Sequence, residues 1–338
     1  MKLLLVQTAF IGDVVLATAL IEQLHQFYPD ATLDFLVRRG NESLLAGHPH
    51  LRKVLIWEKK KEKYRSLLGL IRQIRRERYD WVINCQRFAS SGLLTVCSGS
   101  QTVGFDKNPF SRLFTRRVSH EFGTREHPIH EIARNLRLIE HLTNTDFVRP
   151  RLYPSVGDYE QAVTLAKHQR YVCIAPTSVW LTKQYPEHKW VELIQAFAAD
   201  LTVFLLGGPG DVADCERIRA AAQHPGVQVV AGQLSFLASA ALMEKAVMNY
   251  VNDSAPLHFA SAVNAPVTAV FCSTLPAFGF TPVSDQHWVV ETTHALSCRP
   301  CGLHGKKKCP LGHFNCANTI EVEAFMMPSA APKGLHKE

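Results

Sequence analysis

The stretch NDSAPLHFASAVNAPVTAVF, Asn252–Phe271, decides most about the fold. Its pattern indicates the end of a strand, a polar turn, a short helix and a further strand. Pro256 suits the first turn of a helix, because the N–H that proline lacks has no partner there. A helix that begins with small residues and free amides can bind an anion such as a pyrophosphate. Asp253 and Ser254 are also ordinary N-cap residues, so this stretch alone favours a capped helix over an anion site.

Strands and helices alternate along the rest of the chain, in two successive halves. This alternation predicts an α/β fold with parallel, doubly wound sheets, in which ligands bind at the carboxyl ends of the strands. In the first half we expect strands at Lys2–Gln7, Thr32–Val37 and Trp81–Asn84, and helices at Asp13–Phe27, Tyr64–Arg78 and Arg125–Leu142. In the second half we expect a helix near Val191–Ala198 and strands at Tyr171–Ala175, Thr202–Leu206, Val227–Val230, Asn249–Val251 and Val267–Phe271.

The length of 338 residues favours two domains over one. Val148–Val156 contains two prolines and no hydrophobic period, which is typical of a linker. We therefore expect domains at residues 1–156 and 157–325, with a substrate cleft between them. Residues 326–338 are expected to be a disordered tail.

The composition excludes several classes of protein. Hydrophobic residues make up 46% of the chain and charged residues 20%, as in soluble globular proteins. No run of 18 apolar residues is present, so no membrane span is expected. The apolar N-terminal stretch resembles a signal peptide, but Gln7 and Asp13 interrupt it, and a strand, a loop and a helix explain it better. We therefore expect a cytoplasmic protein.

The net charge is +7, and much of the excess lies between Arg52 and Arg78, where 11 basic residues stand against three acidic ones. Leu67, Leu70 and Ile74 recur there at helical spacing, which predicts a surface helix packed on a sheet. Its basic face can also meet an anionic membrane surface. Nucleic acid is not expected as a partner, because the stretch lacks the interleaved aromatic residues of single-strand binders.

Two loops at the ends of predicted strands carry polar side chains. In QTAFIGDVV, Gly12 permits a close backbone approach, and Asp13 stands at a helix start as either a general base or a helix cap. In APTSVWLTKQYPEHKW, an ammonium lies among three hydroxyls, which is the set of groups that a phosphate needs. The polar residues of this second loop are Thr177, Ser178, Thr182 and Lys183.

A third loop, LLGGPGDVADCERI, matches G-x-G-x-x-A over Gly208–Ala213 and keeps a nicotinamide enzyme in consideration. That fingerprint needs an acidic residue about 20 positions further on to bind a ribose hydroxyl. None stands between Glu216 and Glu244, so the nicotinamide interpretation is the weakest one. We expect a glycine-rich turn in which Asp211 can contact a ribose or a base.

Four cysteines near the C-terminus form C-x2-C-x7-C-x6-C: Cys298, Cys301, Cys309 and Cys316. In a reducing cytosol this spacing favours structural Zn²⁺ over disulfides, although it is not one of the standard zinc ribbons. A metal held there would stabilise the segment 298–316 and would take no part in catalysis.

Four motifs together resemble glycosyltransferase family 9, the bacterial ADP-heptose:lipopolysaccharide heptosyltransferases. They are the GD loop, the loop through Trp180, Lys183 and Pro186, NDSxPLH, and the CRPC…KKKCPLGH…C tail, and they occur in the family's order. The resemblance, most like heptosyltransferase II, extends to about residue 322. It implies a GT-B fold, in which two Rossmann-like domains face each other across a cleft. The N-terminal domain then binds mainly the acceptor, and the C-terminal domain binds the sugar nucleotide.

The resemblance also implies an activity and the residues that carry it. The reaction is an inverting transfer of heptose, without a catalytic cofactor, from ADP-heptose to a lipid-anchored lipopolysaccharide core acceptor at the inner face of the cytoplasmic membrane. Asp13 matches the catalytic base, and Ala255 stands where the family usually has glycine. The implied substrate-binding residues are Gly12, Ser178, Thr182, Lys183, Asp211, Asp253, Ser254, Ala255 and His258.

Two other classes of function stay open at this point. A GT-B-like sugar-nucleotide epimerase shares the two-domain architecture and converts its donor without an acceptor. A non-catalytic module binds the nucleotide or the lipopolysaccharide and turns nothing over.

Overall fold

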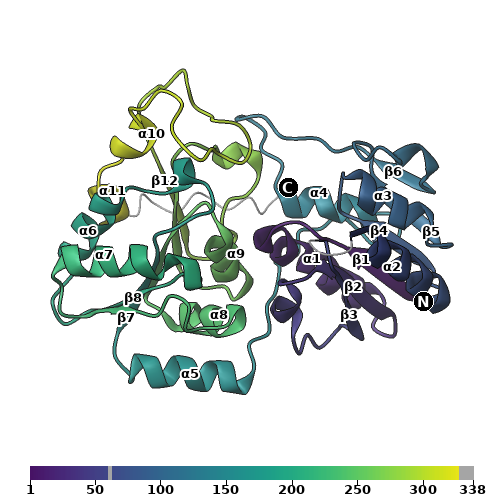
Figure 1. The fold of residues 1–338 in the computed structure, drawn as a ribbon, viewed down its shortest axis with the longest axis horizontal. Helices are drawn as coiled ribbons and strands as arrows, with labels where there is room; N and C mark the ends of the chain where they lie inside the picture. Colours follow the sequence, from purple (N-terminus) through teal and green to yellow (C-terminus); the bar gives the residue numbers. More distant parts are fainter. Residues whose placement is uncertain (60–62, 327–338) are drawn as a thin grey trace. The chain divides into compact units, whose positions relative to one another are not determined.

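The computed structural model describes residues 1–59 and 63–326, apart from the side chains of Lys63 and Tyr64. The chain divides into two compact units, Met1–Tyr153 (unit 1) and Pro154–Glu338 (unit 2). Each unit is built around its own six-stranded sheet with helices packed against it (Figure 1).

Unit 1 contains a fully parallel sheet with the strand order β3-β2-β1-β4-β5-β6. Its strands are β1 (Lys2–Val6), β2 (Thr32–Arg38), β3 (Lys53–Trp57), β4 (Trp81–Asn84), β5 (Gln101–Phe105) and β6 (Arg116–Val118). Its helices are α1 (Ile11–Phe27), α2 (Lys63–Glu77), α3 (Ala89–Val96) and α4 (Glu131–Leu136), with short 3₁₀ turns η1 (Glu42–Leu45), η2 (Ser111–Leu113) and η3 (Arg137–Ile139).

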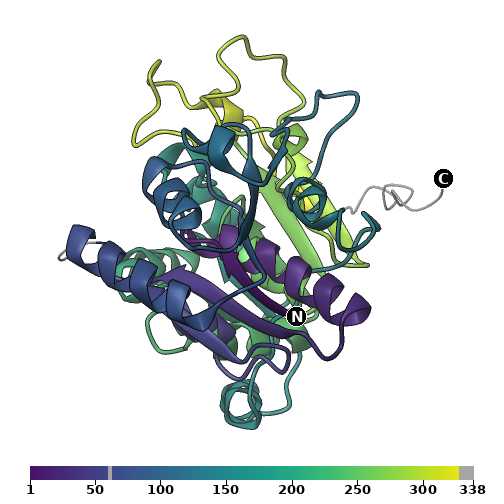
Figure 2. The same ribbon diagram turned by 90° about the vertical axis from the view of Figure 1, so that its right-hand side faces the viewer.

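Unit 2 repeats this arrangement with the strand order β12-β11-β10-β7-β8-β9, again fully parallel. Its strands are β7 (Tyr171–Ala175), β8 (Thr202–Leu205), β9 (Val227–Val229), β10 (Met248–Asn252), β11 (Val267–Phe271) and β12 (His287–Glu291). Its helices are α5 (Val156–Ala166), α6 (Glu187–Gln195), α7 (Val212–Ala222), α8 (Phe236–Lys245), α9 (Ala255–Ala262), α10 (Asn315–Asn318) and α11 (Glu323–Met326), with 3₁₀ turns η4 (Leu181–Lys183), η5 (Pro209–Asp211) and η6 (Pro276–Phe278). The segment after β12 runs as long irregular loops, drawn in yellow-green and yellow (Figure 1, Figure 2).

The two strand orders confirm the predicted α/β, doubly wound fold class. In each sheet, the first three strands along the chain are added outward in one direction. The chain then returns, and the last three strands are added on the other side of the first strand. The order therefore reverses between β1 and β4 in unit 1, and between β7 and β10 in unit 2. In open parallel sheets, ligands bind outside the carboxyl ends of the strands at such a reversal.

Helix α2 shows why the basic stretch folds as it does. Leu67, Leu70 and Ile74 are buried in a cluster with residues of β1, β2, β3 and β4, so this face covers the sheet as predicted. Arg72 and Arg75, outside this stripe, are exposed. Residues 60–62, which belong to the same basic stretch, lie outside the described residues.

Some predicted boundaries were wrong. The helix expected at Arg125–Leu142 begins only at Glu131, after an irregular stretch that contains Pro128, and the His130 side chain caps it by accepting from the Ile132 N–H. Strands β3, β5, β6 and β12 were not predicted. The last residue of the predicted linker Val148–Val156 is the first residue of α5. Met326 is the last residue of α11, and the rest of the expected disordered tail lies outside the described residues.

Candidate active site

Three loops at the carboxyl ends of neighbouring strands bring charged and hydroxyl groups together in unit 2. The loop after β7 carries Lys183, the turn after β10 carries Asp253, and the loop after β11 carries Thr274. Lys183 Nζ lies 2.7 Å from Asp253 Oδ2, and Thr274 Oγ1 donates to the same oxygen at 2.6 Å. This cluster therefore lies at the point where the strand order of the sheet reverses.

The Lys183–Asp253 ion pair is largely shielded from water. The side chain of Asp253 is 6% exposed, and that of Lys183 is 15% exposed. Charges taken out of water need both a partner and further hydrogen bonds, and Thr274 supplies one of these to Asp253. The pair thus holds an ammonium group in a defined position at the sheet edge, where an anionic ligand can reach its exposed part.

Asn252 fixes the backbone around this ion pair. Its side chain is fully buried, with Oδ1 accepting from the Tyr185 N–H at 2.8 Å and Nδ2 donating to the Pro176 carbonyl at 2.9 Å. The end of β10 is therefore joined to both ends of the loop that carries Lys183. Neither Asn252 nor Thr274 was predicted from the sequence; the available signal was an amide at the end of a buried strand, directly before Asp253.

Thr182 and Ser178 belong to the same loop. Thr182 is fully buried, and its Oγ1 accepts hydrogen bonds from the Lys306 N–H at 2.8 Å and from Ser273 Oγ at 2.9 Å. Its hydroxyl is engaged inside the protein, and contact with a substrate stays a prediction. Ser178 is half-buried, and its carbonyl accepts from Gln184 Nε2 at 2.7 Å, which closes the loop.

Helix α9 begins directly after Asp253. Ser254 is its N-cap with an extended backbone (φ −153°, ψ −178°), and Pro256 lies in its first turn. Among the described residues Ala255 is not one of those with positive φ, so alanine fits where the resemblance leads one to expect glycine. The first amides of a helix have no partner within it and carry the positive end of the helix dipole. The chain around Ser254 and Ala255 can therefore offer donors to an anion beside Lys183.

Two further predicted residues lie elsewhere in unit 2. His258, on α9, is buried, with its ring centroid 6.3 Å from that of Phe280. Asp211 ends η5 in the loop after β8, and its Oδ2 accepts from the Gly208 N–H at 2.7 Å. The carboxylate thus closes its own glycine-rich turn, which ends at Asp211 because α7 begins at Val212. Contact between Asp211 and a nucleoside stays a prediction.

In unit 1, Gly12 and Asp13 lie in the first turn of α1, which begins after β1. Phe10 is the N-cap residue, so Asp13 is not the helix cap. Cys85 follows β4, the neighbour of β1, and burial together with the nearby charges of Glu131 and Asp13 raises the pKa of its thiol. Asp13 therefore lies at the sheet edge where the strand order of unit 1 reverses.

A buried ion pair in the same unit was missed by the sequence analysis. Arg134 Nε donates to Glu131 Oε2 at 2.8 Å, and the side chains are 1% and 10% exposed. Burial raises the pKa of Glu131, and the charge of Arg134 opposes this shift. The spacing Glu-x-x-Arg within a helix was the only available signal.

Amide side chains form a network along this edge of unit 1. Gln86 Nε2 donates to Gln7 Oε1, and the Gln86 N–H donates to Asn84 Oδ1 at 2.8 Å. Asn108 Nδ2 donates to the Gln86 carbonyl at 2.9 Å. These groups are buried and neutral, so they fix the loops after β1, β4 and β5 without adding charge.

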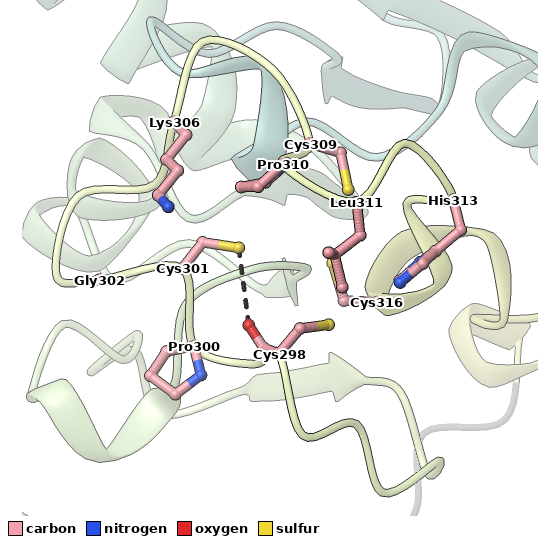
Figure 3. Close-up of a pocket in the computed structure, with 10 residues that line it drawn as sticks. All are labelled: Cys298, Pro300, Cys301, Gly302, Lys306, Cys309, Pro310, Leu311, His313 and Cys316. Carbon is pink, nitrogen blue, oxygen red and sulfur yellow. Dashed lines mark hydrogen bonds between the residues drawn. The ribbon is translucent and has the colours of Figure 1, made fainter.

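The four C-terminal cysteines line one cavity of about 400 Å³. Figure 3 shows their sulfur atoms turned toward a shared space, with the Cys301 thiol donating to the Cys298 carbonyl at 3.8 Å. All four thiols are free. Within residues 1–59 and 63–326, no group of three or more His, Cys, Asp or Glu side chains has an arrangement that could hold a metal ion as it stands. The zinc site stays a prediction.

Burial raises the pKa of the Cys309 thiol, but backbone N–H groups of the turn that follows it outweigh this effect and hold the pKa below its usual value. These donors belong to Phe314, Leu311, Gly312 and His313.

None of the helices in the described part of the chain has the length and apolar character that a membrane span needs.

Comparison with known proteins gives one family for most of the chain. The sequence pattern of "Glycosyltransferase family 9 (heptosyltransferase)" matches residues 67–313. Lipopolysaccharide heptosyltransferase 3 of Escherichia coli K12 is 28% identical over 95% of this chain and 96% of its own length. Among solved structures, E. coli ADP-heptose lps heptosyltransferase II superimposes with a TM-score of 0.74 at 21% identity, over 87% of this chain and 92% of that one. An E. coli heptosyltransferase solved with ADP gives a TM-score of 0.72 at 17% identity, over 96% and 98% of the two chains.

The fold is therefore that of the two-domain, GT-B type of glycosyltransferase. The chain belongs to glycosyltransferase family 9, and it is a glycosyltransferase.

Proposed function

We propose that this enzyme transfers heptose from ADP-heptose to a lipopolysaccharide inner-core acceptor, with inversion at the anomeric carbon and Asp13 as general base. The observation that carries the proposal is the Lys183–Asp253 pair at the strand-order reversal of unit 2, beside the N-terminus of α9. The names of its relatives, an ADP-heptose enzyme among them, support the choice of donor and acceptor.

Unit 2 binds the donor in this proposal. The diphosphate accepts hydrogen bonds from Lys183 Nζ and from the amides of Ser254 and Ala255, while Asp253 keeps the ammonium in place. Ser178 and Thr182 shape the loop on one side, and Asp211 and His258 contact the nucleoside and the sugar. Each preorganised donor of this kind contributes roughly 2.7–4 kcal/mol to the transition state.

The reaction follows from where charge develops. The acceptor hydroxyl loses its proton to the Asp13 carboxylate as its oxygen forms a bond to the anomeric carbon. The bond between that carbon and the phosphate oxygen breaks, and its electron pair leaves with ADP. Because attack comes from the face opposite the leaving group, the configuration inverts. Lys183 and the α9 amides stabilise the charge on ADP, so the proposal requires no catalytic cofactor.

The acceptor is anchored in a lipid, so we propose that the enzyme works in the cytoplasm, in peripheral contact with the inner face of the membrane. The exposed face of α2 supports this, because Arg72, Arg75 and Arg76 are all exposed to solvent. Each basic residue near an anionic surface contributes about 1 kcal/mol to binding.

The test is incubation of the purified protein with ADP-heptose and a set of truncated lipopolysaccharides, with products identified by mass spectrometry. We expect one heptose to be added to one acceptor and ADP to be released. Conversion of the donor without any acceptor would instead indicate the epimerase. Binding of ADP without turnover of any acceptor in the set would indicate the non-catalytic module.

A further inference from the structure

The irregular segment after β12 supports the loop after β11, which carries Thr274. Arg299 Nη2 donates to the Phe271 carbonyl at 3.0 Å and to the Thr274 carbonyl at 2.7 Å. The Cys301 N–H donates to the Ser273 carbonyl between them, at 3.0 Å. The backbone that leads from β11 to Thr274 is therefore held along its length.

Thr274 connects this support to the Lys183–Asp253 pair. Its hydroxyl donates to Asp253 Oδ2 at 2.6 Å, while its carbonyl accepts from Arg299. Asp253 Oδ2 in turn lies 2.7 Å from Lys183 Nζ. The contacts therefore run in one line from Arg299 through Thr274 and Asp253 to the ammonium group.

Ser273 makes a second connection between the same loop and the Lys183 turn. Ser273 Oγ donates to Thr182 Oγ1 at 2.9 Å, and the Ser273 N–H donates to the Thr182 carbonyl at 3.2 Å. The loop after β11 thus contacts both sides of the ion pair, so its position determines theirs.

Arg299 is an unfavourable residue to bury for stability alone. Its side chain is 6% exposed, and Nη2 lies 2.6 Å from Glu291 Oε2 at the end of β12. Among the described residues, Arg299 Nε is buried without a hydrogen-bond partner. A well-packed apolar side chain is often at least as stabilising as a buried ion pair, and an unpaired buried donor costs further free energy. The bonds from Nη2 to the two carbonyls therefore explain this arginine better than stability does.

We propose that Arg299 is a positioning residue of the donor site. It holds the backbone of Thr274 so that the Thr274 hydroxyl keeps Asp253, and through it Lys183, in the geometry that binds a diphosphate. Arg299 itself does not contact the substrate, and its effect is on donor affinity. The inference rests on the proposed binding of the donor diphosphate by Lys183.

The first test is calorimetry with ADP on Arg299→Met, which keeps an extended side chain but removes its donors. We expect ADP to bind about tenfold more weakly, which corresponds to about 1.4 kcal/mol. Tyr171→Phe is the matched control, because it also removes a buried hydrogen bond to a carbonyl, that of Leu242 at 2.8 Å. Tyr171 lies at the opposite end of β7 from the Lys183 loop, so ADP affinity should stay within about twofold. Equal losses in the two variants would refute the positioning role.

The coupling to Thr274 distinguishes a positioning residue from one that only stabilises the fold. Thr274→Val removes the link to Asp253, so Arg299→Met then has no hydroxyl left to misplace. The double variant should therefore bind ADP no more weakly than Arg299→Met alone. Effects that multiply, to about fiftyfold, would overturn the inference.

Arg299→Lys tests whether the hydrogen bonds carry the effect. Because Nη2 alone makes the contacts to the two carbonyls and to Glu291, one ammonium with three donors can replace it. We expect ADP affinity to return to within about threefold of the unchanged protein. If Arg299→Lys binds ADP as weakly as Arg299→Met, the inference fails.

A milder variant keeps the test decisive even if Arg299→Met does not fold. Glu291→Gln removes only the counter-charge of Arg299, at a side chain that is 41% exposed on the edge strand β12. We expect about threefold weaker ADP binding, and no loss when Thr274→Val is already present. Glu321→Gln, which removes the partner of Lys189 in the same unit, should leave ADP affinity unchanged. The same effect in both variants would count against Arg299.

Lys183→Ala separates this inference from the proposed function. In that variant, Arg299→Met should weaken ADP binding no further. If Lys183→Ala weakens binding but Arg299→Met and Glu291→Gln do not, the inference fails and the donor site stands. If ADP binding does not depend on Lys183, both fail together.

Discussion

The two sheets of this protein share one strand order but differ in the chemistry at the point where it reverses. In unit 2 a lysine, a carboxylate and a hydroxyl meet within hydrogen-bonding distance. In unit 1 the same position is occupied by a network of neutral amides from Gln7, Asn84, Gln86 and Asn108, with Asp13 in the adjoining helix turn. A fixed cation suits a diphosphate, whereas neutral amides beside a carboxylate suit a hydroxyl-rich acceptor. In the proposed reaction, the same topology therefore serves two ligands through the side chains at its edge.

The largest effect should come from removing the carboxylate of unit 1. Asp13→Asn keeps the shape of the side chain but cannot accept a proton, so kcat should fall by about 10²-fold or more while ADP affinity is unchanged. Steady-state kinetics and calorimetry measure the two quantities. Asp30→Asn, at the exposed turn after α1, is the control and should be neutral. Near-normal turnover in Asp13→Asn would break the assignment of the base to unit 1.

The cation of unit 2 should matter for binding. Lys183→Ala removes a charged donor, so ADP should bind about 10- to 100-fold more weakly. It also leaves the nearly buried Asp253 without a counter-charge, so the melting temperature should fall as well. Lys189→Ala is the matched control, because Lys189 is similarly shielded and pairs with Glu321, 2.7 Å away. An unchanged ADP affinity in Lys183→Ala would contradict the phosphate role.

Unit 1 should also show a distinct response to acid. Burial, and the neighbouring His50 and His25, lower the pKa of His48 from 6.5 to about 3. As the pH falls, His48 is therefore protonated in the unfolded chain before it is protonated in the folded chain. The free energy of unfolding decreases between about pH 6.5 and pH 3, and His48 accounts for a loss of about 2 kcal/mol at pH 5. The Glu22 carboxylate lies 3.5 Å from the His48 ring. Because burial raises the pKa of Glu22, its protonation in the folded chain offsets part of the stability lost through His48.

Hydrogen exchange measured by mass spectrometry at pH 7 and pH 5 tests this acid response in unit 1. His48→Gln should flatten the loss of protection in α1 and its neighbours, whereas His127→Gln, in an exposed loop, should not. Identical pH dependence in the two variants would exclude His48 as the cause.

The smallest expected effect concerns the hydroxyl that completes the ion pair. Thr274→Val removes the hydrogen bond to Asp253 but keeps the shape of a side chain that is 1% exposed. We expect a loss of about 1 kcal/mol, seen as roughly fivefold weaker ADP binding in calorimetry. Thr274→Ser restores the hydroxyl and should restore the affinity. If Thr274→Ser binds ADP as weakly as Thr274→Val, packing and not the hydrogen bond sets the effect.

Much of the fold could be predicted from the sequence, because the central strands are short runs of buried aliphatic residues. Trp81–Asn84, Tyr171–Ala175 and Val267–Phe271 have the same bounds in the prediction and in the structure. Strands β3 and β12 were missed because each lies at a sheet edge, where only part of the strand is buried and the apolar run is short.

The sequence pointed to Lys183 and Asp253 as candidates, but it pointed neither to Thr274 and Asn252 nor to the contacts among these groups. Lys183 lies in the loop after β7 and Asp253 lies directly after β10, and only the strand order makes these two strands neighbours. The partnership of Thr182 with Lys306 depends on a loop without periodicity, to which no sequence pattern assigns a place. Local signals therefore pointed to Lys183 and Asp253, and the topology determined that these two residues meet.

The buried amide of Asn252 has a consequence for how a ligand is received. Its oxygen and its nitrogen both bind the backbone of the Lys183 loop, and the side chain is fully buried, so it is out of reach of a substrate. The loops after β7 and β10 accordingly behave as one body. The conformational entropy of arranging them is lost when the chain folds, so any ligand that binds there finds the groups already in place.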